Sequence, residues 1–376
     1  MRFVAALITL VGFVATAQST IAADSLYATG DYSAAINAYA KEGTAKAGLQ
    51  IARAYNAIGN YDKSIAQYEA VVATETDLQI ARLELGKLYL KTGHYDEARK
   101  LFTGLVSVNS ANPEYLYYQG EAFRELDQEV SSLVAYKKAI ALDSTHLRSL
   151  FRVAKYLVVE RMPSDALVYI NKGLEIYADD VAMINLKGLN YFNNAQYDKA
   201  IPPFERLLEL GEEKEHMYLK LAYSYFKDWE FEKAKKTYKA LLQLDNSLSK
   251  PYNGLGEVYL KEQKLDSAEI NYRIAIEVQD PILSMEYGAL AYIARQRKDL
   301  KTALEFYKLA YEEDPSSPMA YYQVCTVADQ YYKDPKIRLE YYENFQKKFK
   351  KKHPHYSETV KKRIIELKEE IHFVTN

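Results

Sequence analysis

Small side chains recur along this chain at an almost constant distance, each in the middle of an apolar and aromatic segment. The interval is 34 residues through most of the chain, with one interval of 35. The members of the series are Ala52, Gly86, Gly120, Ala154, Gly188, Ala222, Gly256, Ala291 and Cys325. A larger residue, usually aromatic, follows three positions later in most of the segments. This spacing places both residues on one face of a helix.

A second series lies in the following segment of each interval. Twelve residues after the first small residue come Ser64, Ala98, Ser132, Ala166, Ala200, Ala234, Ala268 and Ala303. Four residues further come Tyr68, Phe102, Tyr136, Ile170, Phe204, Tyr238, Tyr272 and Tyr307. Antiparallel helices approach closely only where small side chains allow it, and a ring one turn away fills the remaining space. The pattern therefore predicts one helical hairpin per interval.

The turn inside each hairpin has its own signature, as in "TGHYDEA" and "IGNYDKS". Gly93 and Gly59 supply a left-handed conformation that ends the first helix, and we expect Asp96 and Asp62 to cap the second. In one later interval, Pro163 is expected to be the first residue of the second helix. The turn glycine itself is replaced by Asp127, Arg161, Ala195, Trp229 and Gln263.

The order of these residues resembles the tetratricopeptide repeat, whose period is 34 residues. The resemblance covers residues 18–350 and is specific because the pattern recurs in register. It implies an all-α fold, a right-handed superhelical solenoid of about ten helical hairpins. The first repeat is shortened, since its turn at Gly30 lies closer to the next turn, at Gly59, than a full interval.

Two departures from the pattern carry structural expectations. Pro202 and Pro203 fall early in a second helix, where proline delays the helix start or kinks it. We therefore expect an altered angle between the repeats on either side. Residues 351–376 form a separate C-terminal segment, in which Ser357 to Ile371 reads as an amphipathic helix that caps the last repeat. Its apolar stripe consists of Val360, Ile364, Leu367 and Ile371.

The N-terminal residues 1–17 have the three parts of a secretory signal peptide: Arg2, an apolar run and a small-residue site at Ala15-Thr16-Ala17. The alternative is a buried first helix. No other apolar stretch has the length of a membrane span. We expect a soluble secreted protein without stable membrane insertion, and the favoured compartment is the periplasm. The single cysteine, Cys325, cannot form an internal disulfide, so it is expected to be a core thiol.

The formal charge of −2 gives the whole chain no attraction to nucleic acid. In the family that the chain resembles, the stripe next to the packing positions of each first helix lines a concave groove. Here this stripe carries large apolar groups and lysines, which we interpret as a groove for a protein or peptide partner. Its candidate residues are Phe151, Lys155, Leu189, Phe192, Tyr223, Phe226 and Lys227. The alternative is that these rings only pack against the neighbouring second helix.

The same stripe, counted over all repeats, holds eleven basic residues and five acidic ones. This count favours an acidic and apolar partner. The basic residues are Lys46, Arg53, Lys87, Lys91, Arg124, Arg148, Lys155, Lys227, Lys250, Lys261 and Arg295. A further basic run, from Lys347 to Lys352 and from Lys361 to Arg363, is a second candidate surface, although most such runs are solvated helix faces.

No catalytic motif is recognisable, and we expect neither an enzyme nor a cofactor. His353 and His355 lack further ligands at metal-binding spacing. The leading hypothesis is a non-catalytic interaction scaffold of the cell envelope. A glycan- or cell-wall-peptide-binding module is the alternative, which the 35 tyrosines favour. The sequence leaves the partner's identity and the oligomeric state open.

Overall fold

The computed structural model describes residues 21–75, 77–278, 283–349 and 354–375. Every regular element in these ranges is an α-helix, which confirms the predicted all-α fold. The chain divides into two compact units, residues 1–186 and 187–376, called unit 1 and unit 2 below. The boundary falls inside helix α11, Val181–Asn193.

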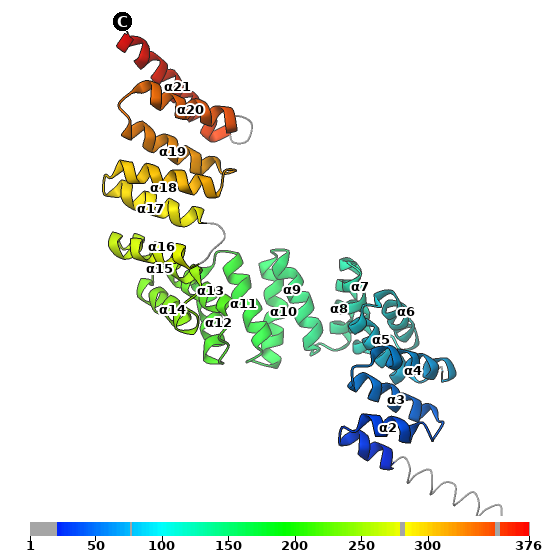
Figure 1. Cartoon of the computed structure of the whole chain (residues 1–376). Helices are drawn as coiled ribbons and strands as arrows, with labels where there is room; N and C mark the ends of the chain where they lie inside the picture. Colours follow the sequence, from blue (N-terminus) through cyan, green and yellow to red (C-terminus); the bar gives the residue numbers. More distant parts are fainter. Residues whose placement is uncertain (1–20, 76, 279–282, 350–353, 376) are drawn as a thin grey trace, which may run out of the picture. The chain divides into compact units, whose positions relative to one another are not determined.

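Unit 1 is a solenoid in which helices that follow one another in the chain pack side by side (Figure 1). A helical segment at residues 21–28 precedes the first labelled helix. The labelled helices are α2 (Tyr32–Tyr39), α3 (Ala45–Ala57), α4 (Tyr61–Thr74), α5 (Gln79–Thr92), α6 (Tyr95–Val108), α7 (Pro113–Glu125), α8 (Glu129–Leu142), α9 (Leu147–Val159) and α10 (Pro163–Ile176). The expected shortening of the first repeat is confirmed, since α2 has 8 residues where α4 has 14.

Unit 2 repeats this arrangement, with each helix packed on the next in chain order. Its helices after α11 are α12 (Tyr197–Glu209), α13 (Glu215–Lys227), α14 (Phe231–Leu244), α15 (Ser249–Lys261), α16 (Leu265–Glu277), α17 (Ser284–Gln296), α18 (Leu300–Glu313), α19 (Pro318–Tyr331), α20 (Pro335–Phe349) and α21 (Pro354–Thr375). The first helices of neighbouring hairpins also touch, as α13 and α15 do.

The hairpins close through a ring set against a helix backbone. A Cβ atom added to Gly120 would lie 2.5 Å from the Tyr136 ring, and one added to Gly256 would lie 2.7 Å from the Tyr272 ring. Real Cβ atoms do not approach other atoms this closely, so only glycine fits at these two positions without a shift of the ring. The predicted complementarity of small and large positions is thereby confirmed.

The turns adopt the predicted conformation at Gly59 and Gly93, whose φ angles are 77° and 83°. The capping prediction is wrong. Asp62 and Asp96 lie inside the first turn, and the N-cap positions belong to Asn60 and His94. Both carboxylates still stabilise the helix, because they face the positive end of its dipole.

The left-handed turn is kept where glycine is lost. The replacing residues all have positive φ, and Lys298 joins the five that the sequence indicated. Their φ angles lie between 55° and 65°: Asp127, Arg161, Ala195, Trp229, Gln263 and Lys298. A side chain at this conformation costs about 1–2 kcal/mol relative to glycine. The hairpin geometry therefore outweighs the local preference of these residues.

Helix α12 corrects one expectation. It starts at Tyr197, one full repeat interval after the start of α10 at Pro163, so Pro202 and Pro203 do not delay it. Both prolines lie inside the helix. The hairpin contacts therefore hold the helix together although each proline removes one backbone hydrogen bond. The altered angle between neighbouring repeats stays a prediction.

The C-terminal helix covers the end of unit 2, as expected. In α21, Val360 and Leu367 are fully buried and Ile364 nearly so, in one cluster with Phe345 of α20 and Cys325 of α19. The cysteine is thus a core thiol, and burial raises its pKa far above the ordinary value. None of the described helices combines the length and apolar character that a membrane span requires. The signal-peptide segment, residues 1–17, lies outside the described residues.

Candidate functional site

The structure places the seven predicted groove residues on three first helices. Phe151 and Lys155 belong to α9 in unit 1, where Lys155 is exposed and lines a small pocket of about 170 Å³ with Arg152. The other five belong to unit 2: Leu189, Phe192, Tyr223, Phe226 and Lys227. Four of these five belong to one continuous network of contacts.

That network is a row of six rings, here called the aromatic row: Phe192, Tyr197, Tyr223, Phe226, Phe231 and Trp229. Consecutive ring centroids are 5.6–6.1 Å apart, the range in which aromatic pairs attract each other. The rings come from helices α11 to α14 and the turn between α13 and α14. Five of the rings are half-buried, and Trp229 is 72% exposed.

Two lysines lie against this row. The Nζ atom of Lys220 is 4.2 Å from the centroid of the Phe192 ring. The Nζ atom of Lys227 lies 5.7 Å from Tyr223 and 5.8 Å from Tyr197. The ring faces thus hold both ammonium groups by cation–π attraction, which strengthens where water is excluded.

Some of these contacts agree with the alternative interpretation, in which the rings pack against the neighbouring second helix. Phe192 meets Phe204 on the second helix of its own hairpin at 6.5 Å, and Phe226 meets Phe231 on α14. The same rings nevertheless keep an accessible edge, since none of the row is fully buried. The row is therefore anchored in the core and still partly exposed.

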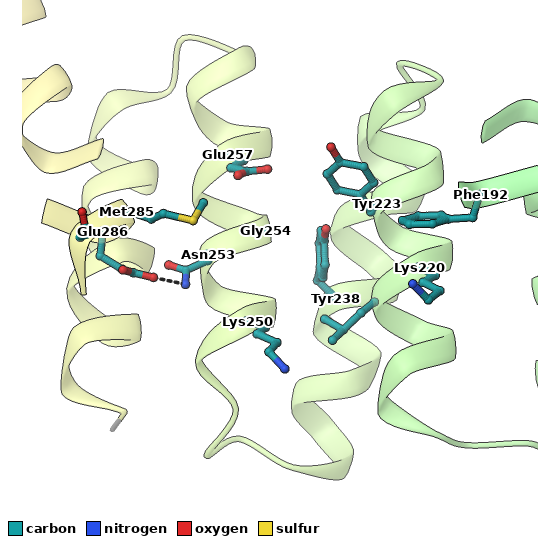
Figure 2. A pocket seen from close by; sticks show the side chains of 12 residues that line it. Phe192, Lys220, Tyr223, Tyr238, Lys250, Asn253, Gly254, Glu257, Met285 and Glu286 are labelled. Atoms are coloured by element: carbon teal, nitrogen blue, oxygen red, sulfur yellow. Dashed lines mark hydrogen bonds between the residues drawn. The ribbon is translucent and has the colours of Figure 1, made fainter. Parts of the chain in front are cut away.

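The sequence reasoning missed a pocket of about 560 Å³ in unit 2, here called the Gly254 pocket (Figure 2). It opens beside the row, with Phe192 and Tyr223 in its wall and Tyr238 of α14 behind them. The opposite wall is α15, which contributes Gly254 and Glu257. A signal for it was available, because glycine at 254 follows a series of large residues at the corresponding position of the preceding repeats.

Some polar and charged groups at the rim of the Gly254 pocket have a hydrogen-bond or ion-pair partner, and others have no ion-pair partner among the described residues. Asn253 donates a hydrogen bond from Nδ2 to Glu286, and Lys250 lies 3.6 Å from Glu215. Burial raises the pKa of the Glu257 carboxyl, and the charge of Lys227 opposes this shift. Burial also lowers the pKa of the Lys220 ammonium.

Several basic residues of the predicted groove are paired with carboxylates of this protein, one of which, Glu84, was not in the sequence count. Arg53 is bonded to Glu84, Arg148 to Glu114, and Arg124 to Glu121 and Glu125. Glu84 was missing from the sequence count because it lies outside the assumed stripe. The excess of six positive charges is therefore not all free to attract an acidic partner.

The second basic surface is only partly described. Lys348 lies 4.9 Å from the rings of Tyr311 and Tyr321, and Arg363 is bonded to Asp329 at 2.8 Å. Lys350, Lys351, Lys352 and His353 lie outside the described residues, as does the side chain of His355. Within the part of the chain that the structure describes, no three His, Cys, Asp or Glu side chains are placed to hold a metal ion.

Comparison with known proteins agrees with the repeat pattern. Sequence models of the tetratricopeptide repeat match residues 56–119, 215–248 and 253–318. Among curated proteins, the antiviral innate immune response effector IFIT1 of Macaca fascicularis is 23% identical over 161 residues. The match covers 41% of this chain and 31% of IFIT1, so the chain spans less than a third of that relative's length.

Two solved structures are similar over most of this chain. Yeast Tom70 is 12% identical, with a TM-score of 0.46 over 95% of this chain and 96% of the other. The C-terminal part of a TPR repeat-containing protein from Cytophaga hutchinsonii is 19% identical, with a TM-score of 0.47 over 73% of this chain and 99% of the other. Repeat models match segments in both units, and the glycine–ring contacts recur at the repeat period. The chain belongs to the tetratricopeptide repeat family.

Proposed function

We propose that this protein is a non-catalytic scaffold for protein–protein interaction, and that the aromatic row of unit 2 binds a segment of its partner. The observation that supports the proposal is the exposure of the row. Six rings in contact keep accessible edges, and Trp229 is 72% exposed. Such a surface offers a partner a large apolar contact area with few side-chain torsions to restrict.

Trp229 strengthens the proposal. It occupies a left-handed turn position, with a φ angle of 65°, where the first repeats of this chain have glycine at Gly30, Gly59 and Gly93. That conformation costs about 1–2 kcal/mol for a side chain, and a ring that is 72% exposed regains little of this by burial. A partner that covers the Trp229 ring would bury its apolar surface and so gain the stabilising free energy that the ring does not provide in the free protein.

The test is binding of a displayed peptide library to the chain from residue 18, followed by affinity measurements on variants. Phe192→Ala and Lys227→Glu should each weaken binding at least about tenfold, the loss expected for a central contact residue. Ile270→Ala is the matched control, because Ile270 is an apolar residue of unit 2 that is 58% exposed outside the row. Unchanged affinity in both row variants would remove the row from the binding surface.

The cellular location that we propose is the periplasm, reached through the N-terminal segment that reads as a signal peptide. The purified native protein should then begin at Gln18. Intact mass and N-terminal sequencing measure this directly. A native chain that retains Met1 to Ala17 would contradict export by cleavage of that segment.

Trp229 also favours a second candidate, a glycan-binding module. A small hollow of about 130 Å³ lies between Trp229, Phe226, Phe231, Lys227 and Lys261. Flat aromatic faces stack on sugar rings, and the two lysines could bind acidic sugar substituents. Because Trp229 is the only tryptophan, its fluorescence reports on this hollow alone. A saturable change with glycan or muropeptide fragments, and none with library-selected peptides, would favour this candidate.

A further inference from the structure

The Gly254 pocket exists because one repeat lacks a side chain that its neighbours carry. Counting back from Gly254 in steps of one repeat interval, the corresponding positions hold Lys220, Leu186, Arg152, Tyr118 and Glu84. A Cβ atom at Gly254 would lie 2.2 Å from Cζ of Tyr238. The ring of Tyr238 therefore lies directly against the backbone of α15, in the place where a side chain at position 254 would begin, and the pocket opens beside this ring.

The open space is large enough for one bulky side chain. The pocket volume is about 560 Å³, and its apolar surfaces come from Tyr223, Tyr238, Leu219 and Met285. Figure 2 shows Met285 and Tyr223 on opposite sides, with Tyr238 between them. A leucine or phenylalanine side chain seated there would contact rings and a thioether, and burial of such a side chain contributes about 1.5–3 kcal/mol.

Two charged groups at this pocket have no oppositely charged partner among the ion pairs of the described residues. Lys220 on α13 is half-buried, and its ammonium lies over the Phe192 ring. Glu257 on α15 is half-buried, and the charge of the exposed Lys227 acts on its carboxyl. Figure 2 shows Glu257 and Lys220 on opposite helices, with the rings of Tyr223 and Tyr238 between them.

Two other polar side chains of the pocket have partners within the protein. Asn253 donates a hydrogen bond to Glu286, and the Nζ atom of Lys250 lies 3.6 Å from the Glu215 carboxylate, which partly neutralises its charge. A ligand would therefore meet a positive group, Lys220, and a negative group, Glu257, neither of which forms an ion pair among the described residues, on opposite sides of an apolar floor. A partly desolvated charge gains the most when a ligand brings its counter-ion.

We propose that the Gly254 pocket binds one apolar anchor residue of a partner peptide, with an acidic residue beside it that pairs with Lys220 and a basic residue that pairs with Glu257. This inference rests on the proposed function and adds the chemistry of the segment that is bound. In an extended peptide the side chains two positions before and two positions after the anchor lie on the same face as the anchor, so these positions carry the acidic and the basic residue.

The experiment uses three short peptides with blocked ends and a leucine anchor, measured by fluorescence anisotropy with the chain from residue 18. The charged neighbours stand two positions before and two positions after the anchor, on its own face. One peptide has an acidic and a basic neighbour of the anchor, one has two acidic neighbours and one has two basic neighbours. The wild-type chain should bind the mixed peptide about tenfold more tightly than either of the others. Equal affinity for all three peptides would overturn the inference.

Two single charge reversals move the preference in opposite directions. Lys220→Glu should prefer the peptide with two basic neighbours, and Glu257→Lys the peptide with two acidic neighbours. Lys236→Glu is the control, because Lys236 is exposed on α14 outside the pocket, and it should keep the wild-type order. A preference that does not change in either pocket variant overturns the inference.

Displacing the Tyr238 ring from the pocket wall, which a side chain at position 254 must do, gives an independent readout. Gly254→Leu should weaken the mixed peptide by at least about tenfold, provided that its circular dichroism melting curve shows a folded chain. If this variant does not fold, the charge reversals decide the question alone. Loss of peptide binding in Phe192→Ala with no effect of the pocket variants would retain the scaffold function and overturn the inference. Absence of any row-dependent binding would overturn the proposed function itself.

Discussion

The Cζ atom of Phe102 lies 2.6 Å from the place where a Cβ atom on Gly86 would stand. Phe102 is fully buried, so its ring cannot move aside without disturbing the core of unit 1. This contact joins the two helices of one hairpin, α5 and α6. It shows why the small residue of each first helix and the ring of the second helix form one packing unit.

Gly86→Ala should destabilise the chain by about 1–3 kcal/mol, the usual cost of an extra carbon in a close-packed core. Gly104→Ala is the matched control, since nothing lies within 4 Å of a Cβ at this helical position. The control should gain about 0.5–1 kcal/mol from helix propensity. Urea unfolding followed by circular dichroism measures both. Equal effects of the two changes would contradict the close contact.

Ala195→Gly should stabilise the chain by about 0.5–1 kcal/mol. Ala195 has a φ angle of 56°, and glycine adopts this conformation without the clash that a Cβ atom causes. The greater entropy of glycine in the unfolded chain offsets part of this gain. Ala66→Gly in the exposed part of α4 should instead lose about 1 kcal/mol. Thermal unfolding of the two variants should thus move the midpoint in opposite directions.

Glu121→Gln should cost about 3 kcal/mol, because the change removes the charged acceptor of a largely buried network. Glu121 accepts hydrogen bonds from Arg152 at 2.6 and 2.7 Å and from the Tyr136 hydroxyl at 2.6 Å. Asp96→Asn breaks an exposed ion pair with Arg99 and should stay within about 0.5 kcal/mol of wild type. A small effect at Glu121 in urea unfolding would show that the network contributes little.

Glu257→Gln should stabilise the chain at neutral pH. Burial raises the pKa of Glu257 above its ordinary value of 4.5, so the folded chain binds this proton more tightly than the unfolded chain. Stability that depends on this group is therefore lost as the pH rises from 4.5 through the raised pKa. The variant has no such loss, so its advantage should disappear below pH 4.5. Glu277→Gln, exposed on α16, is the control, and thermal unfolding at the two pH values provides the comparison.

Ending the chain at Phe349 should cause self-association. Helix α21 covers Phe345 and Phe349, which are 1% and 4% exposed when it is present. Its removal uncovers the apolar end of unit 2, and solenoids need a polar cap to stay soluble. Light scattering should show larger species than for the full-length chain. A monomeric truncated chain would mean that the exposed cluster is tolerated.

The sequence predicts the repeat because packing of a hairpin depends on volume at fixed positions. Gly120 and Tyr136 can be paired from spacing alone, and the stripe of Val360, Ile364 and Leu367 indicates its own helix. The wrong N-cap prediction arose where two neighbouring residues could each have started the helix. Asp62 and Asp96 have a favourable capping side chain, yet Asn60 and His94 occupy the N-cap positions because the turn fixes the helix start.

The charge balance and the pocket are harder to predict, since both depend on which side chains of neighbouring repeats meet. Whether Arg53 is free depends on Glu84, which lies on α5 in the next hairpin. The opening at Gly254 depends on Tyr238, a residue of the preceding hairpin. Neither the Arg53–Glu84 pair nor the Tyr238–Gly254 contact can be predicted from the face of a single helix, because each involves residues of two hairpins. Aligning each position with its counterparts in the other repeats would have revealed Gly254 as an exception.

The glycine of each first helix and the ring that packs on it are close in sequence as well as in space, so the ribosome synthesises them within a short interval. Gly86 and Phe102, like Gly188 and Phe204, lie on consecutive helices, so each contact forms within a segment that leaves the ribosome together. Contacts at such short separation close quickly, and chains rich in them fold fast. The hairpins can therefore fold one after another during synthesis. An export route that needs an unfolded chain must then transport the chain faster than the hairpins fold.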